Sequence, residues 1–217
     1  MPRKPRDLTA LHPYHIQDRC NNQDWFNVPH SICFSIYTEV MEKVLERYNL
    51  SLHAFVMMSN HYHLIASTPD SNISSAMRYF NTETSKGIGR ASGRINHLYG
   101  GRFKSTLIDH PSYYANCLKY LYRNPVKANI VDRAEDYFWS TLSNSNPKMT
   151  RMTRAPVTGH DCYIQWPKSD LVNWINRPFA SDVEAAVEKG LMRSKFSWMV
   201  DQKTRKLVDK EAFVPRR

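Results

Sequence analysis

Residues 55–66, FVMMSNHYHLIA, constrain the fold of this chain more than any other stretch. Two apolar runs flank Ser59 and Asn60, residue types that favour tight turns, so the stretch predicts a β-hairpin. Side chains of a strand alternate between its two faces, and His61 and His63 therefore share one face of the predicted sheet. Two imidazoles on one face are able to bind one cation. Such pairs also occur on exposed strands, so the meaning of this pair depends on what else reaches the same face.

The apolar patterns between residues 13 and 109 predict strands at 13–19, 50–58 and 61–67, and a turn into a fourth strand over 100–109. Helices are predicted at 29–48 and from residue 73 to about residue 85. The order β-α-β-β-α-β is that of a ferredoxin-like sandwich, an α+β fold with two helices on one side of an antiparallel sheet. The opposite face of the sheet is expected to be open for a ligand. His15, in the first strand, is expected to be structural.

A third helix is predicted over residues 111–123, and Pro125 is expected to end it because a proline disfavours helical geometry at the preceding Asn124. Tyr120 and Asn124 are four residues apart and share one helix face, the end of which would meet the two histidines. A tyrosine at helical spacing is more often a core residue than a nucleophile. The spacing alone therefore does not establish catalysis.

The charge of the chain favours a polyanionic partner, and nucleic acid is the partner we expect. Lys and Arg number 30 against 20 Asp and Glu, a net charge of +10 at pH 7. The excess is concentrated between residues 73 and 104, where Glu83 is the single acid and the basic residues are Arg78, Lys86, Arg90, Arg94, Arg102 and Lys104. Interleaved aromatic residues offer stacking surfaces, so this basic segment predicts a nucleic-acid interface. A merely solvated basic face is the alternative.

Cysteine usage and hydropathy exclude several classes of protein. Cys20, Cys33, Cys117 and Cys162 show no Cys-x-x-Cys spacing, and we expect no signal peptide, so buried, reduced thiols in a cytoplasmic protein are predicted. No run of about 18 apolar residues is present, and neither a membrane span nor a membrane partner is expected.

Arg102 and Lys104 are expected to share one face of the fourth strand by the two-residue period.

Three motifs, MSNHYHL (58–64), GGRFKS (100–105) and YLYRNPVKA (120–128), occur in an order found in one family of enzymes, and YFWST (137–141) is similar to a further segment of that family. Together they resemble the REP-associated tyrosine transposases, which are single-tyrosine HUH transposases of bacterial insertion sequences. The resemblance covers about residues 12–143. It departs at Ser59 and Phe138, where proline is common in the family, and at Asn129, where glycine is usual.

This resemblance implies a divalent-metal nuclease that cuts single-stranded DNA and joins it to a tyrosine. Carried over residue by residue, His61 and His63 are the metal-ligand pair, Tyr120 is the nucleophile and Asn124 stands at the position of a third ligand. Three protein ligands leave positions for phosphate and water, which suits Mg²⁺ or Mn²⁺. Tyr122 is about 200° further round the helix and is the weaker candidate for the nucleophile.

The resemblance also implies the partner and the division of the chain. The expected substrates are single-stranded DNA and DNA hairpins formed by palindromic repeats, with the basic segment against the backbone. We expect a flexible basic arm (1–11), an HUH catalytic domain (12–143) and a basic, partly helical tail (144–217) with two short helices. The tail would dock on the core and contact DNA, the protein would associate with the nucleoid, and both monomer and homodimer remain open.

Two alternatives belong to other functional classes. A single-strand-binding regulator, in which the histidines are incidental or cleavage is lost, would bind without metal and tolerate Tyr120→Phe. A metal-dependent phosphoesterase would use water as its nucleophile and form no covalent adduct. A structural metal site is disfavoured because it requires a fourth ligand, and His53 lies on another strand.

Overall fold

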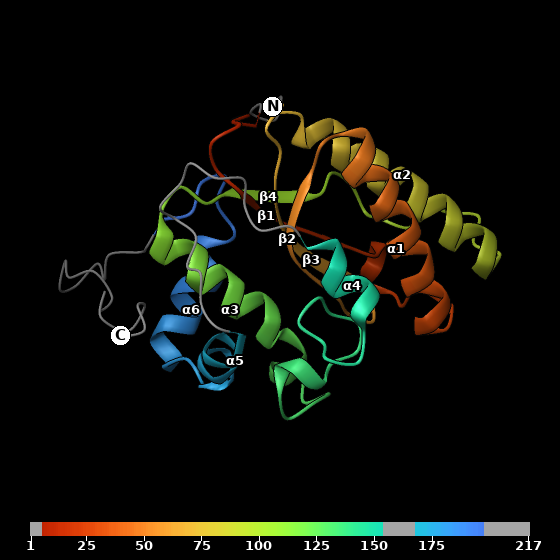
Figure 1. Cartoon of the computed structure of the whole chain (residues 1–217). Coiled ribbons are helices and arrows are strands. Elements are labelled where there is room, and N and C mark those ends of the chain that lie inside the picture. The colour runs from red at the N-terminus through yellow and green to blue at the C-terminus, as the bar shows by residue number, and fades with distance from the viewer. Residues whose placement is uncertain (1–5, 154–167, 198–217) are drawn as a thin grey trace.

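A four-stranded antiparallel sheet lies at the centre of the molecule (Figure 1). The computed structural model describes residues 6–153 and 168–197, and the account below concerns these residues. The strand order is β2-β3-β1-β4, with the bounds Tyr14–Arg19 (β1), Ser51–Met57 (β2), His61–Ser67 (β3) and Lys104–Leu107 (β4). The predicted α+β, ferredoxin-like fold is confirmed. Cys162, the first five residues of the predicted arm and the last twenty residues of the tail lie outside the described part.

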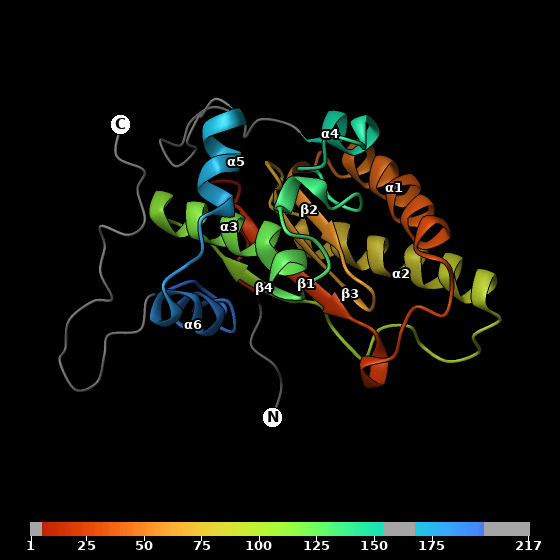
Figure 2. The same ribbon diagram turned by 90° about the horizontal axis from the view of Figure 1, so that it is seen from below.

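Helices α1 (His30–Arg47) and α2 (Ile73–Ser92) cover one face of the sheet (Figures 1 and 2). Helix α2 is longer than predicted and ends at Ser92, where Gly93 caps it with a left-handed φ of 68°. Its last two turns bury only Ile88, so the apolar period that marks a helix fades there although the helix continues. Among the described residues, no helix is both long enough and apolar enough to span a membrane.

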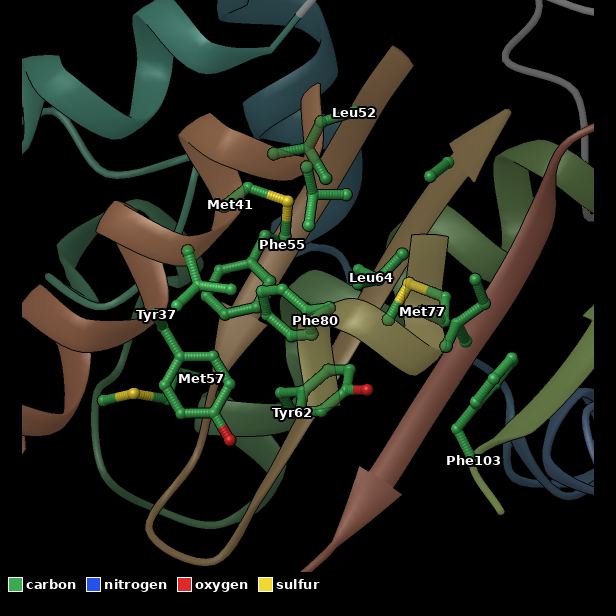
Figure 3. Close-up of a cluster of buried hydrophobic side chains, with 14 of the residues drawn as sticks. Tyr37, Met41, Leu52, Phe55, Met57, Tyr62, Leu64, Met77, Phe80 and Phe103 are labelled. Atoms are coloured by element: carbon green, nitrogen blue, oxygen red, sulfur yellow. The ribbon is translucent and has the colours of Figure 1, made fainter. Parts of the chain in front are cut away.

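The core beneath α1 and α2 is rich in aromatic side chains, as Figure 3 shows. The Tyr62 ring packs edge-on against Phe80, with centroids 5.4 Å apart, and Tyr37 lies 5.5 Å from the same ring. The Tyr37 and Tyr99 hydroxyls meet at 2.6 Å and satisfy each other inside the core. Tyr62 points into this core because the histidines on either side of it point to the opposite face.

The opposite face of the sheet is covered, so the prediction that it is open is wrong. Helix α3 (Pro111–Lys127) packs on β2 and β3, with α5 (Lys168–Asn176) and α6 (Ser181–Gly190) outside it (Figure 2). The second core contains Val56, Ile65 and Leu121. The β2 residues Ala54 and Val56 and the β3 residue Ile65 are apolar on this face, and this part of the sheet requires a cover. The face remains accessible only toward the β1 and β3 ends that carry Arg19 and His61.

Helix α3 continues through Pro125 to Lys127, so its predicted end at residue 123 is wrong. Pro125 has no N–H to donate to the Leu121 carbonyl one turn earlier. The Asn124 side-chain amide compensates, because its Nδ2 donates to the Leu121 carbonyl at 3.3 Å and to the Tyr120 carbonyl at 2.9 Å. Asn124 is therefore a helical residue one turn beyond Tyr120.

The described tail docks on α3 through one stripe of basic side chains spaced four residues apart. Lys119 lies over two aromatic rings at 4.7 and 4.8 Å, Arg123 donates to the last carbonyls of α5 at 3.1 Å, and Lys127 forms ion pairs with α6. Their partners are, in the same order, Phe179 and Trp174, Ile175 and Asn176, and Glu184 and Glu188. This stripe adjoins the one that carries Tyr120 and fixes the rotation of α3 about its axis.

The tail then reaches the free edge of β4. The Leu107 N–H donates to the Ser194 carbonyl at 2.9 Å, and the Phe196 N–H donates to the Leu107 carbonyl at 2.8 Å. These bonds cover a strand edge that would otherwise expose unpaired backbone groups. The two predicted tail helices are present as α5 and α6, whereas the exact division of the chain at residues 11 and 143 stays a prediction. Short helices η1 (Asn21–Gln23), η2 (Ala134–Asp136) and α4 (Pro147–Met152) complete the described chain.

Candidate active site

Strand register places the two histidines of β3 beside polar residues of β1. His61 lies opposite Arg19, and His63 lies opposite Gln17, so these side chains share a face. Gln17 also lies opposite Lys104 of β4. The accessible end of the sheet therefore presents two imidazoles, with Arg19 beside His61 and with Lys104 beyond Gln17 from His63, and these two exposed cations are suited to a phosphate.

Both histidines have their Nδ1 atoms engaged by neighbours. His61 Nδ1 lies 2.7 Å from Asn60 Oδ1, and His63 Nδ1 lies 3.1 Å from His15 Nε2. The two β3 rings are 5.0 Å apart between centroids. Each ring therefore has its Nε2 atom left to offer to a ligand, and neutral imidazole nitrogens on adjacent rings are suitable donors for a divalent cation.

Helix α3 brings Tyr120 to the same place. The half-buried Tyr120 ring lies 6.0 Å from the His63 ring and perpendicular to it, and 6.5 Å from the His15 ring. These contacts join residues separated by more than fifty positions in the sequence. Of the two histidines that this helix face was predicted to meet, the structure places His63 beside Tyr120.

Asn124 lies one turn from Tyr120 on the same stripe of α3. Because its Nδ2 is committed to backbone carbonyls, its Oδ1 is the atom available to a cation. Among the described residues, no hydrogen bond joins Asn124 to either histidine of β3, and no group of three His, Cys, Asp or Glu side chains is arranged to hold a metal. An amide oxygen is a ligand that Mg²⁺ and similar hard cations accept, so Asn124 Oδ1 suits the position of a third ligand.

Burial determines the protonation of these groups. It lowers the pKa of His61 to about 4, with a smaller contribution from the Arg19 charge, and that of His15 to about 3. The pKa of His63 is also lowered, first by burial and then by its neighbours. The imidazoles are therefore neutral at pH 7, the form that binds metals. Burial raises the pKa of the Tyr120 phenol to about 12, and the Glu188 charge adds to the effect.

Tyr122, the weaker candidate for a nucleophile, lies in the core. It is buried, and its hydroxyl is 2.9 Å from the Thr141 hydroxyl. Tyr122 points away from the histidines because two positions on a helix are about 200° apart. Tyr120 is therefore the tyrosine of α3 that shares the site with His63.

Five of the six basic residues proposed for DNA binding line two adjoining hollows along α2, of about 720 and 590 Å³. We call this the α2 groove; its basic lining is Arg6, Arg78, Lys86, Arg90, Arg94 and Arg102. Arg94 is mostly buried and pairs with Asp24 at 3.3 Å, while Lys86 pairs with Glu83 at 2.8 Å. The groove lies on the side of the sheet that α1 and α2 cover, opposite the face that carries the histidines.

Lys104 is separated from Arg102, so the prediction that the two share a strand face is wrong. Strand β4 begins at Lys104, and Arg102 precedes it in a bend. Lys104 aligns with Gln17 on the histidine face, whereas Arg102 lines the α2 groove beside Phe103. The two-residue period applies only within a strand, and here it does not extend back to Arg102.

Sequence reasoning missed three residues of β1 that belong to the site: His15, Gln17 and Arg19. Their two-residue spacing was a signal, because it places all three on one face. Their relevance required the β1–β3 register, which pairs Gln17 with His63. His15, expected to be only structural, touches both His63 and Tyr120.

His53 provides a test of how burial controls stability with pH. Burial lowers the His53 pKa from 6.5 to about 3, so its neutral form stabilises the fold above pH 6.5 and this contribution is lost as the pH falls toward 3. When the pH is lowered from 7.5 to 5.5, the unfolding free energy of the wild type should fall. We expect the fall in the His53→Gln variant to be smaller by roughly 1 kcal/mol. Urea unfolding in EDTA at both pH values measures this difference. Parallel losses in the two proteins would contradict it.

The comparison with family models found a match in the segment that carries the site. Residues 27–124 match the family described as "Transposase IS200 like", and this segment contains His61, His63, Tyr120 and Asn124. The matched segment is therefore similar to the IS200-like transposases. The comparison with curated proteins found no match.

The comparison with solved structures found a protein of similar fold. The structure described as "Structure of the REP associates tyrosine transposase bound to a REP hairpin" aligns with a TM-score of 0.56 and 20% identity, and the match covers 77% of this chain and 99% of that chain. At this identity the likeness shows the fold. Together with the family match, it confirms the resemblance to the REP-associated tyrosine transposases that the motifs indicated.

Proposed function

We propose that this protein is a single-tyrosine HUH transposase that cleaves and rejoins single-stranded DNA beside hairpins. The observation that carries the proposal is the convergence of Tyr120 from α3 with His61 and His63 from β3, within 6.0 Å between the Tyr120 and His63 rings. The family match and the hairpin-bound relative support the same activity. The enzyme would act in the cytoplasm, at the nucleoid, where its DNA lies.

Tyr120 would act as the nucleophile. Its phenolic oxygen loses its proton to solvent and attacks the phosphorus, a bond from the tyrosine oxygen to phosphorus forms, and the bond from phosphorus to the 3′ oxygen breaks. The products are a 5′-phosphotyrosine and a strand that ends in a 3′-OH, which takes up a proton. A later attack by a 3′-OH reverses these bond changes and releases Tyr120, so rejoining needs no nucleoside triphosphate.

His61, His63 and Asn124 would hold a divalent cation, Mg²⁺ or Mn²⁺, through two imidazole nitrogens and one amide oxygen. When bound, such an ion polarises a non-bridging phosphate oxygen and offsets the charge that develops in the transition state. The protein needs this help because burial raises the Tyr120 pKa to about 12, which disfavours its anion. Arg19, beside His61, and Lys104, beyond Gln17 on the same face, would position the scissile phosphate.

The α2 groove would hold the backbone of the hairpin. Its exposed cations are spread along α2, a helix of 20 residues, and along the loop that follows. Tyr99 and His97 also line the groove. Ionic contacts with phosphates position a nucleic acid without reading its sequence. Cleavage and hairpin binding would thus occur on opposite sides of the sheet, and the DNA strand would pass round the edge of the sheet.

The groove makes a prediction about salt dependence. Replacing both Arg78 and Arg102 by Gln should weaken hairpin binding about tenfold and reduce the slope of log K against log salt by about two, because each arginine would neutralise one phosphate. Lys43→Gln is the matched control, because Lys43 lies on α1 outside the groove and pairs with Glu39 at 2.7 Å. Fluorescence anisotropy with a labelled hairpin at several salt concentrations measures both effects. An unchanged slope in the double variant would place the DNA elsewhere.

Incubation with labelled single-stranded hairpins, ideally repeats from beside the gene, in Mn²⁺ or Mg²⁺ tests the proposed function. A metal-dependent, protease-sensitive adduct that mass spectrometry maps to Tyr120 is the expected result. Cleavage without an adduct would instead favour the water-using phosphoesterase. Metal-independent binding with no cleavage of any repeat would favour the single-strand-binding regulator.

A further inference from the structure

His15 is the hydrogen-bond partner of His63 within the sheet. Its Nε2 lies 3.1 Å from His63 Nδ1, and both rings are buried on the central strands β1 and β3. The ring centroids are 5.2 Å apart, with planes tilted by 32°. Neither motif nor family match assigns a role to this residue, because the matched segment begins at residue 27.

We propose that His15 is a positioning residue that accepts a hydrogen bond from His63 Nδ1–H and thereby keeps the lone pair of His63 on Nε2, toward the cation. The inference rests on the proposed function, since it concerns the same metal site. A neutral imidazole carries one N–H, so a hydrogen bond at one nitrogen decides which nitrogen is free to bind a metal. The reverse bond, from His15 to His63, would leave the proton on His63 Nε2 and block that atom.

His61 has a corresponding partner on its own Nδ1. Asn60 Nδ2 donates to the Gln23 carbonyl at 2.8 Å, which turns Asn60 Oδ1 toward His61 at 2.7 Å. An amide oxygen only accepts, so His61 must carry its proton on Nδ1. Each histidine of β3 thus has a partner at Nδ1, and the two Nε2 atoms are left as a matched pair of donors.

His15 does not fit as a third metal ligand. Its Nε2 is committed to His63, and the described residues contain no set of three His, Cys, Asp or Glu side chains arranged for a metal. Its 6.5 Å ring distance from Tyr120 also places it behind the site and not at its mouth. It would therefore act on the metal through the orientation and tautomer of His63.

Calorimetric titration of Mn²⁺ into the full-length protein tests this role without DNA or activity. We expect His15→Phe to bind Mn²⁺ about 10- to 100-fold more weakly than the wild type, the usual effect of losing an outer-shell partner. His15→Gln should restore most of the affinity, because the Gln side chain is able to place an acceptor near the position of Nε2. His53→Phe is the matched control: it alters another buried histidine of the sheet, one whose Nε2 lies 3.0 Å from the Ser67 hydroxyl, and should leave the affinity unchanged.

Nitrogen-15 spectra of the wild-type histidines provide a second readout that needs no variant. Without metal, in EDTA, His63 should carry its proton on Nδ1, and a proton on Nε2 would overturn the inference. Wild-type affinity in a folded His15→Phe protein would overturn it as well. Failure of the wild type to bind Mn²⁺ at all would instead refute the proposed metal site, and the inference would fall with it.

Discussion

Tyr120→Phe will abolish covalent attachment of DNA to the protein and reduce strand cleavage by at least about 1,000-fold. The substitution removes one oxygen, the atom that would bond to phosphorus, and leaves the ring in place against His63 and His15. The Tyr120 hydroxyl makes no hydrogen bond to any described residue, so its loss should cost little stability. Hairpin affinity should also remain, because the α2 groove is on the other side of the sheet.

Tyr122→Phe is the matched control for this variant. It removes a hydroxyl from the next tyrosine of the same helix, one that lies 2.9 Å from the Thr141 hydroxyl inside the core. We expect it to lower the unfolding free energy by about 1 kcal/mol and to keep the adduct. Denaturing gels of labelled hairpin with each variant, beside urea unfolding, separate the two effects. An adduct that persists in Tyr120→Phe and disappears in Tyr122→Phe would exchange the roles of the two residues.

His61→Ala should show the second large effect, a loss of metal-dependent cleavage of about 100-fold or more. His61 is half-buried at the accessible end of β3, and its Nε2 is one of two imidazole donors that the site offers. Removing it leaves His63 and Asn124, a weaker ligand set, so the Mn²⁺ concentration needed for half-maximal cleavage should rise. Cleavage by the wild type should stop in EDTA and return when Mn²⁺ is added in excess.

The control for His61→Ala is an equally drastic change at a histidine outside the site. His110→Ala serves, because His110 is exposed at the start of α3 and bonds to Ser112. It should lose a helix cap worth about 1 kcal/mol and retain metal-dependent cleavage. Cleavage rates of the three proteins across a series of Mn²⁺ concentrations measure the effect. Equal metal dependence in His61→Ala and the wild type would remove His61 from the ligand set.

The tail contacts give these active-site variants a structural context. Lys119, Arg123 and Lys127 hold α5 and α6 against α3, on the stripe beside the one that carries Tyr120 and Asn124. A helix attached along one stripe has little freedom to rotate, and rotation would carry Tyr120 away from the histidines. The tail therefore contributes to the geometry of the site although none of its residues was a candidate from the sequence.

Local patterns in the sequence determined the elements and the main candidates. The alternation around the hairpin placed His61 and His63 on one face, and the four-residue spacing placed Tyr120 and Asn124 on one helix stripe. Periods of two and 3.6 residues arise from the geometry of the backbone, so they are readable without a partner segment. The order of the elements then indicated the fold.

The tertiary structure decided what depends on contacts between distant segments. It continued α3 through Pro125 by means of the Asn124 amide, and it covered the face that the pattern left open. It also joined His15 to His63 through the β1–β3 register, although 48 positions separate them. No local period encodes which strand pairs with which or what covers a sheet, because these choices follow from burying apolar surface across the whole chain.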